Sequence, residues 1–182
     1  MKRTKTGAAP SRDGDTIEEW VAGSYSTAYR TAYLIVRNAS DAEEAVQDAF
    51  LRVWRFRDSL PAGAQRDAWL YRVIVNSCHS LLRREIPRRE RTIASGAEAS
   101  SREPTPEQAA EQSETADAVA SALGALPDHL RIPIILRYGT GLSEQEIATA
   151  IQRRPGTVKS RLHEARRRLA GDPNIATLEA QR

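Results

Sequence analysis

Apolar residues recur at three- and four-residue intervals over two stretches of the chain, from Thr16 to about Arg84 and from about Ala116 to Ala170. This spacing places them on one side of a helix, and such a side must be buried against another element. The pattern therefore predicts an all-α protein made of two small helical domains, which we place at 16–85 and 116–170.

The remaining segments lack this periodicity. Residues 1–15 are rich in Gly, Ala, Ser and charge, and we expect them to be disordered. Residues 86–115 are rich in Pro, Ser, Glu and Ala, which is typical of a flexible acidic linker between the two domains. Residues 171–182 form a short tail.

The clearest helix of the first domain is predicted from about Asp41 to Phe56. Ser40 and Glu43 have the spacing of a capping box, in which each side chain satisfies a free backbone N–H group. The apolar stripe of this helix consists of Ala42, Ala45, Val46, Ala49, Phe50, Val53 and Trp54. The opposite face carries Glu44, Gln47, Asp48 and Arg52.

A further helix is predicted from Asp67, as N-cap, to Arg84. Trp69, Arg72 and Asn76 place an aromatic ring, a cation and an amide on it. Bases stack on aromatic rings and phosphates attract cations, so this mixture suits single-stranded nucleic acid. Core aromatics followed by a basic helix end would explain the same residues, and composition does not separate the two interpretations.

The second domain contains two short helices in succession. Ser143 and Glu146 form a second capping box at the start of a helix that extends to Ile151. Residues 152–155 break the periodicity, and a second helix follows over 156–169. Its inward stripe consists of Val158, Leu162, Ala165 and Leu169. Two short helices joined by a tight turn are typical of a helix-turn-helix.

The outward face of the second helix is basic, as a helix that enters the DNA major groove requires. Seven basic residues lie between Arg153 and Arg168. This cluster favours DNA binding over a helical hairpin with a solvated basic face. The outward residues are Thr157, Lys159, Ser160, Arg161, His163, Glu164 and Arg167.

Composition narrows the class of protein. The net charge of +3 permits nucleic acid as a partner without requiring it. Cys78 is the single cysteine, which excludes a disulfide framework and a cysteine metal cluster.

We find no apolar run near the roughly 20 residues that span a bilayer and no signal peptide, so we expect a cytoplasmic protein. The three histidines are scattered and no phosphate-binding glycine loop is present, so we expect neither an enzyme nor a cofactor or metal.

Two separate sets of motifs resemble the extracytoplasmic-function (group IV) sigma factors of RNA polymerase. The segments that carry the resemblance are Asp41 to Trp54, Trp69 to Asn76, Leu126-Pro127, Leu136 to Tyr138, and Leu142 to Ala148 with Gly156 to His163. They stand in the order and spacing of that family and cover about residues 16–85 and 116–170.

The resemblance implies a division of labour between the domains. Core RNA polymerase would be held at its clamp by Glu44, Gln47, Asp48 and Leu51. The melted minus-ten element of promoter DNA would be read by Arg57, Arg66, Trp69, Arg72, Asn76 and Arg83. The basic face of the second helix-turn-helix helix would read the minus-thirty-five element as duplex. An anti-sigma protein is a further possible partner.

Several positions depart from the family pattern. Gln152 stands where glycine is usual in the helix-turn-helix turn, and Arg153 stands where an apolar residue is usual. Pro133 is tolerable only if its helix starts close by, near Ile132. The loop at 58–65 also differs, so the promoter consensus stays open. The alternative function is a helix-turn-helix regulator that is not a polymerase subunit, which would leave the Asp41 to Asn76 motifs without a purpose.

Overall fold

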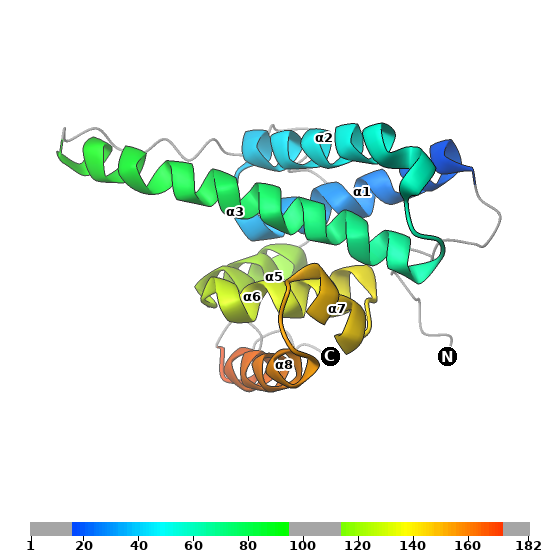
Figure 1. The fold of residues 1–182 in the computed structure, drawn as a ribbon. Helices are drawn as coiled ribbons and strands as arrows, with labels where there is room; N and C mark the ends of the chain where they lie inside the picture. The colour runs from blue at the N-terminus through cyan, green and yellow to red at the C-terminus, as the bar shows by residue number, and fades with distance from the viewer. Residues whose placement is uncertain (1–15, 95–113, 173–182) are drawn as a thin grey trace.

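The computed structural model describes residues 16–94 and 114–172, and every regular element within these ranges is helical (Figure 1). The all-α class with two helical domains is therefore confirmed. The expectations for residues 1–15, for 95–113 of the linker and for 173–182 lie outside the described residues.

Three helices build the first domain: α1 (Ile17–Val36), α2 (Ala39–Phe56) and α3 (Ala64–Ala94). A short 3-10 turn, η1 (Arg57–Ser59), follows α2. The three helices pack against one another pairwise, with α2 on the outer side of the domain (Figure 1). Their core contains Ala42, Ala45, Val46, Ala49 and Val53 from α2, together with Ile35 of α1 and Leu70 and Ile74 of α3.

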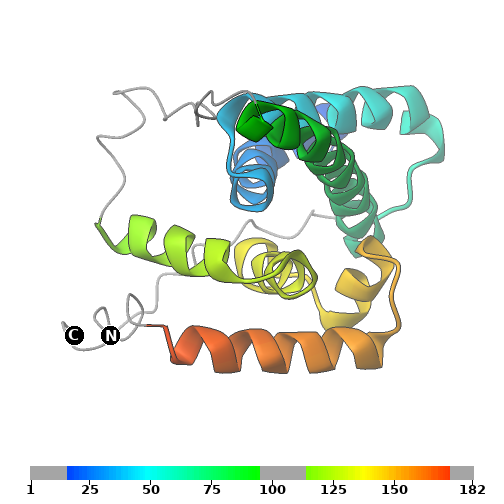
Figure 2. The ribbon, with the colours of Figure 1, turned by 90° about the vertical axis from the view of Figure 1, so that its left-hand side faces the viewer.

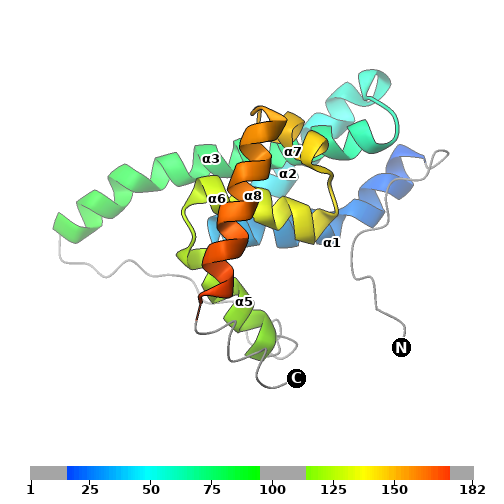
Figure 3. The ribbon, with the colours of Figure 1, turned by 90° about the horizontal axis from the view of Figure 1, so that it is seen from below.

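The second domain consists of α5 (Glu114–Ala125), α6 (Asp128–Ile135), the π-helical turn η2 (Leu136–Thr140), α7 (Glu144–Ala150) and α8 (Pro155–Ala170). The capping box of Ser143 and Glu146 is confirmed, because the Ser143 N–H donates to the Glu146 carboxylate at 2.6 Å. Val158, Leu162 and Ala165 of α8 are buried, as their spacing predicts. The helices α7 and α8 are the helix-turn-helix (Figure 3).

Two predicted helix starts are wrong. Asn38, not Ser40, caps α2, because its side-chain oxygen accepts from the Asp41 N–H at 3.0 Å, and the helix begins at Ala39. The helix α3 begins at Ala64, so Asp67 lies inside its first turn. The Asp67 carboxylate instead accepts from the Trp20 indole N–H at 2.8 Å and ties α3 to α1.

The predicted end of α3 is also wrong. The helix continues ten residues past Arg84, through Pro87, to Ala94, so the first part of the expected linker is helical. Proline removes one intrahelical hydrogen bond, but the four residues after it are Arg, Arg, Glu and Arg, which all favour helix strongly. Local propensity thus outweighs the break that Pro87 predicts.

Pro133 lies inside α6, which begins at Asp128 and not near Ile132. Asp128 and His129 at the start of the helix are exposed, but every residue from Leu130 to Leu136 is buried, so the turns around Pro133 have no solvent-facing side. Packing on all sides compensates for the backbone hydrogen bond that Pro133 cannot make. The regular α-helix nonetheless gives way to the π-helical turn from Leu136 onward.

Gln152 adopts a left-handed backbone conformation with φ of 53° in the turn between α7 and α8. The turn thus keeps the geometry that favours glycine, and Arg153 is exposed, so its charge needs no burial. We expect Gln152→Gly to raise the free energy of unfolding by about 1 kcal/mol, because the side chain no longer opposes this conformation. Urea denaturation measures the gain, with Gln152→Ala as the control that keeps the strain. Equal stability of the two variants would contradict this.

The two domains pack directly against each other. The helix α7 lies against α3, and α6 lies against α1 (Figure 2), and buried apolar side chains form a single core through both domains. The nucleic-acid-binding helices that the sequence predicts, α3 and α8, therefore lie on either side of α7 in one compact body.

Candidate nucleic-acid and polymerase interfaces

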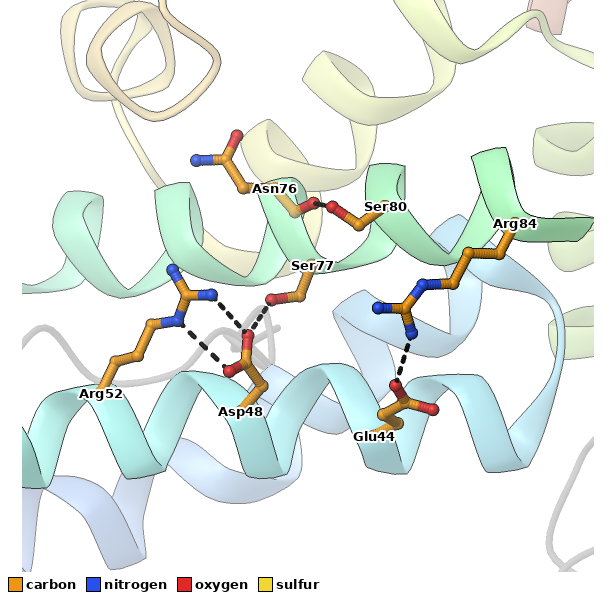
Figure 4. Close-up of polar contacts among 7 residues, drawn as sticks. All are labelled: Glu44, Asp48, Arg52, Asn76, Ser77, Ser80 and Arg84. Atoms are coloured by element: carbon orange, nitrogen blue, oxygen red, sulfur yellow. Dashed lines mark hydrogen bonds and ion pairs between the residues drawn. The ribbon is translucent and has the colours of Figure 1, made fainter.

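The residues predicted to bind core RNA polymerase differ in their exposure and in whether they already bond to another side chain. Gln47 and Leu51 point outward from α2, and 70% of Leu51 is exposed. Glu44 is exposed but accepts from Arg84 of α3 at 3.3 Å (Figure 4). Such exposed ion pairs contribute little to stability, so Glu44 remains available to a partner.

Asp48 lies between α2 and α3 and not on a fully solvated face. Its carboxylate accepts from the Ser77 hydroxyl at 2.5 Å and pairs with Arg52 at 3.1 Å (Figure 4). Partial burial works to raise the pKa of Asp48, but the hydrogen bonds from Ser77 and Arg52 outweigh it and hold the pKa below its usual value. Asp48 therefore links α2 to α3 and is also part of the α2 surface near Leu51.

Trp54 is not part of the buried stripe, and this prediction is wrong. At 100° per residue it lies roughly 120° from the centre of the buried stripe, and Phe50 lies about 80° from it. Trp54 is accordingly 55% exposed and Phe50 half-buried, whereas Leu51 points directly away. The same angles, calculated from the sequence alone, predict that Trp54 is exposed. Leu51 and Trp54 together form the exposed apolar part of the α2 face.

The predicted minus-ten residues of α3 share one face. Trp69, Arg72, Asn76 and Arg83 lie within about 60° of one another around the helix axis. Arg72, Asn76 and Arg83 are exposed, and Trp69 is half-buried. The Trp69 ring packs edge-on against Phe56, with the ring centroids 6.5 Å apart. This contact holds the indole in place, and Arg72 and Asn76 follow it within two turns on the same face of α3.

Arg66 and Arg57 hold structural contacts at the ends of the loop between α2 and α3. The Arg66 guanidinium lies 5.4 Å from the centre of the buried Trp20 ring and donates to the Pro61 carbonyl at 3.2 Å. Arg57 covers the Trp54 ring at 4.9 Å. Arg66 thus orients the loop, and of the two only Arg57 is exposed enough to reach a ligand without rearrangement.

The outward face of α8 has the composition that the sequence predicts. Lys159, Ser160, His163 and Arg167 are exposed, while Thr157, Arg161 and Glu164 are half-buried. A groove between α7 and α8 is lined by Gln145, Thr149, Gln152, Arg153, Arg154 and Thr157. Polar and basic side chains thus surround the amino-terminal end of α8, where a recognition helix meets base edges.

Glu164 is engaged within α8. Its two carboxylate oxygens bind Arg167 at 2.7 Å and Arg168 at 2.8 Å. Hydrogen bonds from Arg167 and Arg168 hold the pKa of Glu164 below its usual value. The carboxylate therefore orients two cations on α8, and it could accept a bond from a cytosine amino group only by giving up one of them.

His79 of α3 is half-buried where the two domains meet. Burial lowers its pKa, and Arg83 and Arg131 add to this effect, while Asp128 opposes it. The unfolded chain, with a pKa near 6.5, therefore binds a proton at a higher pH than the folded chain does. We expect the His79 contribution to stability to be fully present above pH 6.5 and to be lost as the pH falls below it.

Denaturation of the wild type and of His79→Leu at a series of pH values measures this loss. The unfolding free energy of the wild type should fall relative to that of His79→Leu as the pH falls below 6.5. A difference that is constant with pH would show that the His79 pKa is the same in both states.

The part of the chain that the structure describes holds no cluster of three or more His, Cys, Asp or Glu side chains placed to bind a metal ion. Cys78 is buried, and burial raises the pKa of its thiol to about 12, so it is unreactive at neutral pH. Within the described ranges, no helix is long and apolar enough to cross a membrane.

Comparison with known families decides between the two functional interpretations. Residues 21–86 match the model of Sigma-70 region 2, and residues 116–169 match that of Sigma-70 region 4. The ECF RNA polymerase sigma factor SigM of Mycobacterium tuberculosis is 37% identical over 142 residues, which are 78% of this chain and 69% of that protein. The chain belongs to the ECF RNA polymerase sigma factors. Sigma factors are DNA-recognition subunits, and the predicted family is confirmed.

Other sigma factors support the same assignment. The RNA polymerase sigma-H factor of Pseudomonas aeruginosa is 34% identical over 144 residues, which are 73% of this chain and 75% of that protein. SigE of Mycolicibacterium smegmatis is 31% identical over 84% of this chain, but the match spans only 59% of SigE.

Two solved structures are similar in fold. The sigma factor RpoE in complex with the anti-sigma factor NepR, from Bartonella quintana, superposes with a TM-score of 0.69 at 28% identity, over 84% of this chain and 92% of RpoE. CnrH in complex with the cytosolic domain of CnrY shares the fold with a TM-score of 0.60, over 91% of this chain and 88% of CnrH.

Proposed function

We propose that this sigma factor binds core RNA polymerase through the outward face of α2 and directs promoter-specific initiation in the cytoplasm. The first domain, over 16–85, reads the minus-ten element as melted strand, and the second, over 116–170, reads the minus-thirty-five element as duplex. One observation supports this most: two chemically different nucleic-acid faces, one aromatic and basic on α3 and one basic on α8, stand in a single chain.

The alternative, a regulator that is not a polymerase subunit, accounts only for α7 and α8. It leaves the exposed Leu51 and Trp54 of α2 unexplained, although large apolar side chains in such positions favour a protein partner. The match to the sigma factor RpoE in its complex with an anti-sigma factor also supports an anti-sigma protein as a partner of this chain.

Polymerase binding combines an apolar centre with a polar rim. Leu51 and Trp54 supply the apolar surface, and Glu44, Gln47 and Asp48 surround it with acceptors that suit a basic clamp surface. Asp48 contributes its charge while it stays bound to Ser77, so a charge-reversing substitution there would also disturb the packing of α2 on α3.

The α8 face divides into residues that bind phosphate and residues that read bases. Lys159→Ala should weaken binding to all promoters alike and reduce the salt dependence of binding by about one unit, because one phosphate contact is lost. Substitution of Ser160 or His163 should instead change which minus-thirty-five sequences are preferred.

Titration of promoter fragments with holoenzyme at several salt concentrations tests both expectations. A Lys159→Ala variant that keeps the wild-type salt dependence and changes sequence preference would reverse the roles of these residues. Failure of the wild-type chain, together with core polymerase, to retain any promoter fragment would remove the proposed function itself.

A further inference from the structure

The turn between α7 and α8 ends α7 with two backbone hydrogen bonds (Figure 2). The Gln152 N–H donates to the Thr149 carbonyl at 3.3 Å, and the Arg153 N–H donates to the Ala148 carbonyl at 2.9 Å. With Gln152 in the left-handed conformation, this is the Schellman arrangement that ends many helices. Its usual residues are a glycine at the left-handed position and, directly after it, an apolar residue that packs back on the helix.

This chain departs from both preferences. Gln152 has a side chain at the position where glycine is free of strain. Arg153 places a charged and exposed side chain where an apolar contact is usual. Glycine and an apolar residue would therefore stabilise the turn better, so the stability of the turn explains neither residue. Backbone strain that a protein retains in this way is typical of functional positions.

Both side chains lie next to the predicted DNA-reading face of α8. The helix begins at Pro155, and the groove at its amino-terminal end is lined by Gln152 and Arg153 as well as by Thr157. The Arg153 guanidinium donates to the Gln152 carbonyl at 3.4 Å, which keeps the cation beside the turn. A recognition helix enters the major groove by its amino-terminal end, so residues directly before that end also lie close to the DNA.

The two side chains differ in the part of DNA that they suit. The Gln152 amide presents a donor and an acceptor side by side, which match the N7 and N6 groups of adenine in the major groove. The Arg153 guanidinium is a permanent cation and suits a backbone phosphate. All side chains that line the groove are neutral or basic, so an anionic duplex meets no repulsion there.

We propose, on the basis of the function proposed above, that the turn is itself part of the minus-thirty-five reader. Gln152 contacts a base edge, and Arg153 contacts a phosphate of the DNA backbone. The residues assigned to this element so far all lie on α8, from Thr157 onward, and the turn extends the reading surface beyond the start of that helix. Gln152 thus lowers stability in return for recognition, because glycine would form the same turn but offer no side chain to a base.

The variants Gln152→Gly and Gln152→Ala together test the base contact. Both remove the amide, whereas the glycine also relieves the backbone strain. We expect both, as holoenzyme, to lose at least about fivefold of the preference for one base at one position of the minus-thirty-five element. The probe is a library of promoter duplexes with a fixed minus-ten element and a minus-thirty-five element that varies at every position, and the retained sequences are counted.

The pair of variants separates the side chain from the backbone. Wild-type sequence preference in both would overturn the base contact. A loss in only one of the two would also overturn it, since the effect would then follow the backbone and not the amide. If the wild-type holoenzyme retained no member of the library, the proposed function itself would fail, and the inference with it.

Arg153→Gln tests the phosphate contact. It should reduce the salt dependence of binding by about one unit for every promoter in the library, because one phosphate contact is lost. The matched control is Arg30→Gln, which removes the same charge from an exposed position of α1 in the other domain. Titration of holoenzyme at several salt concentrations measures both slopes, and circular dichroism confirms that the variants are folded. Equal slopes for Arg153→Gln and Arg30→Gln would overturn the role of Arg153.

Each variant also serves as a control for the other contact. Gln152→Ala should keep the wild-type salt dependence, because it removes no charge. Arg153→Gln should keep the base preference that is lost with Gln152. A change in base preference with Arg153→Gln and a change in salt dependence with Gln152→Ala would overturn the assignment of the two residues.

Discussion

Leu51→Glu should lower the affinity for core RNA polymerase by roughly 10- to 150-fold and leave the fold intact. Leu51 is 70% exposed, so its substitution removes no contact that the free protein needs. In a complex, burying a leucine side chain contributes about 1.5–3 kcal/mol, which corresponds to that range of affinity. The exposed Trp54 lies next to it on the same side of α2, which is why we propose Leu51 as the centre of the interface and not its rim.

Titration of labelled core polymerase with each variant measures the effect. Glu43→Gln is the control, because it changes an exposed α2 residue outside the proposed interface. Wild-type affinity of Leu51→Glu, with the control unchanged, would place the polymerase interface on another surface.

Trp69→Ala should weaken the binding of the melted minus-ten strand by roughly 5- to 150-fold. The loss of one base stacked on an aromatic ring costs about 1–3 kcal/mol. Because Trp69 also packs on Phe56, the matched variant is Trp69→Phe, which keeps an aromatic ring in that position. Binding of holoenzyme to a promoter fragment with a pre-melted minus-ten segment, compared with the fully paired fragment, measures the effect.

The same comparison separates stacking from stability. Trp69→Phe should restore most of the binding on the pre-melted fragment, and the thermal midpoints of both variants show how much packing is lost. If Trp69→Ala bound the pre-melted strand as well as the wild type, Trp69 would be a core residue with no part in base recognition.

Periodicity predicted the helices because side chains 3.6 residues apart share a side, and that rule holds wherever one side is buried. The ends of the helices depend on single interactions instead. The Asn38 side chain accepts the hydrogen bond that caps α2, and the basic residues after Pro87 allow α3 to continue. Neither feature alters the apolar pattern, so periodicity does not predict it. The sequence therefore predicts the elements and the fold class better than their limits.

In the candidate sites, too, periodicity predicts which residues are exposed but not the individual contacts that they make. The exposed residues of α8 followed from their position relative to the stripe of Val158, Leu162 and Ala165. Contacts between distant segments did not, because nothing in the pattern links Asp48 to Ser77 or Arg131 to Ile35. In the sequence, Arg131 is one more basic residue, and only the packing of α6 on α1 brings its guanidinium to a carbonyl group of the other domain.

The most direct test of the central claim is transcription in vitro from a genomic library. Purified protein is added to core RNA polymerase free of any sigma factor, and transcript start sites are mapped. The account predicts start sites that appear only with the protein and share two sequence elements, near minus ten and minus thirty-five. Start sites identical to those of core polymerase alone, obtained while Leu51-dependent binding to core is intact, would contradict it.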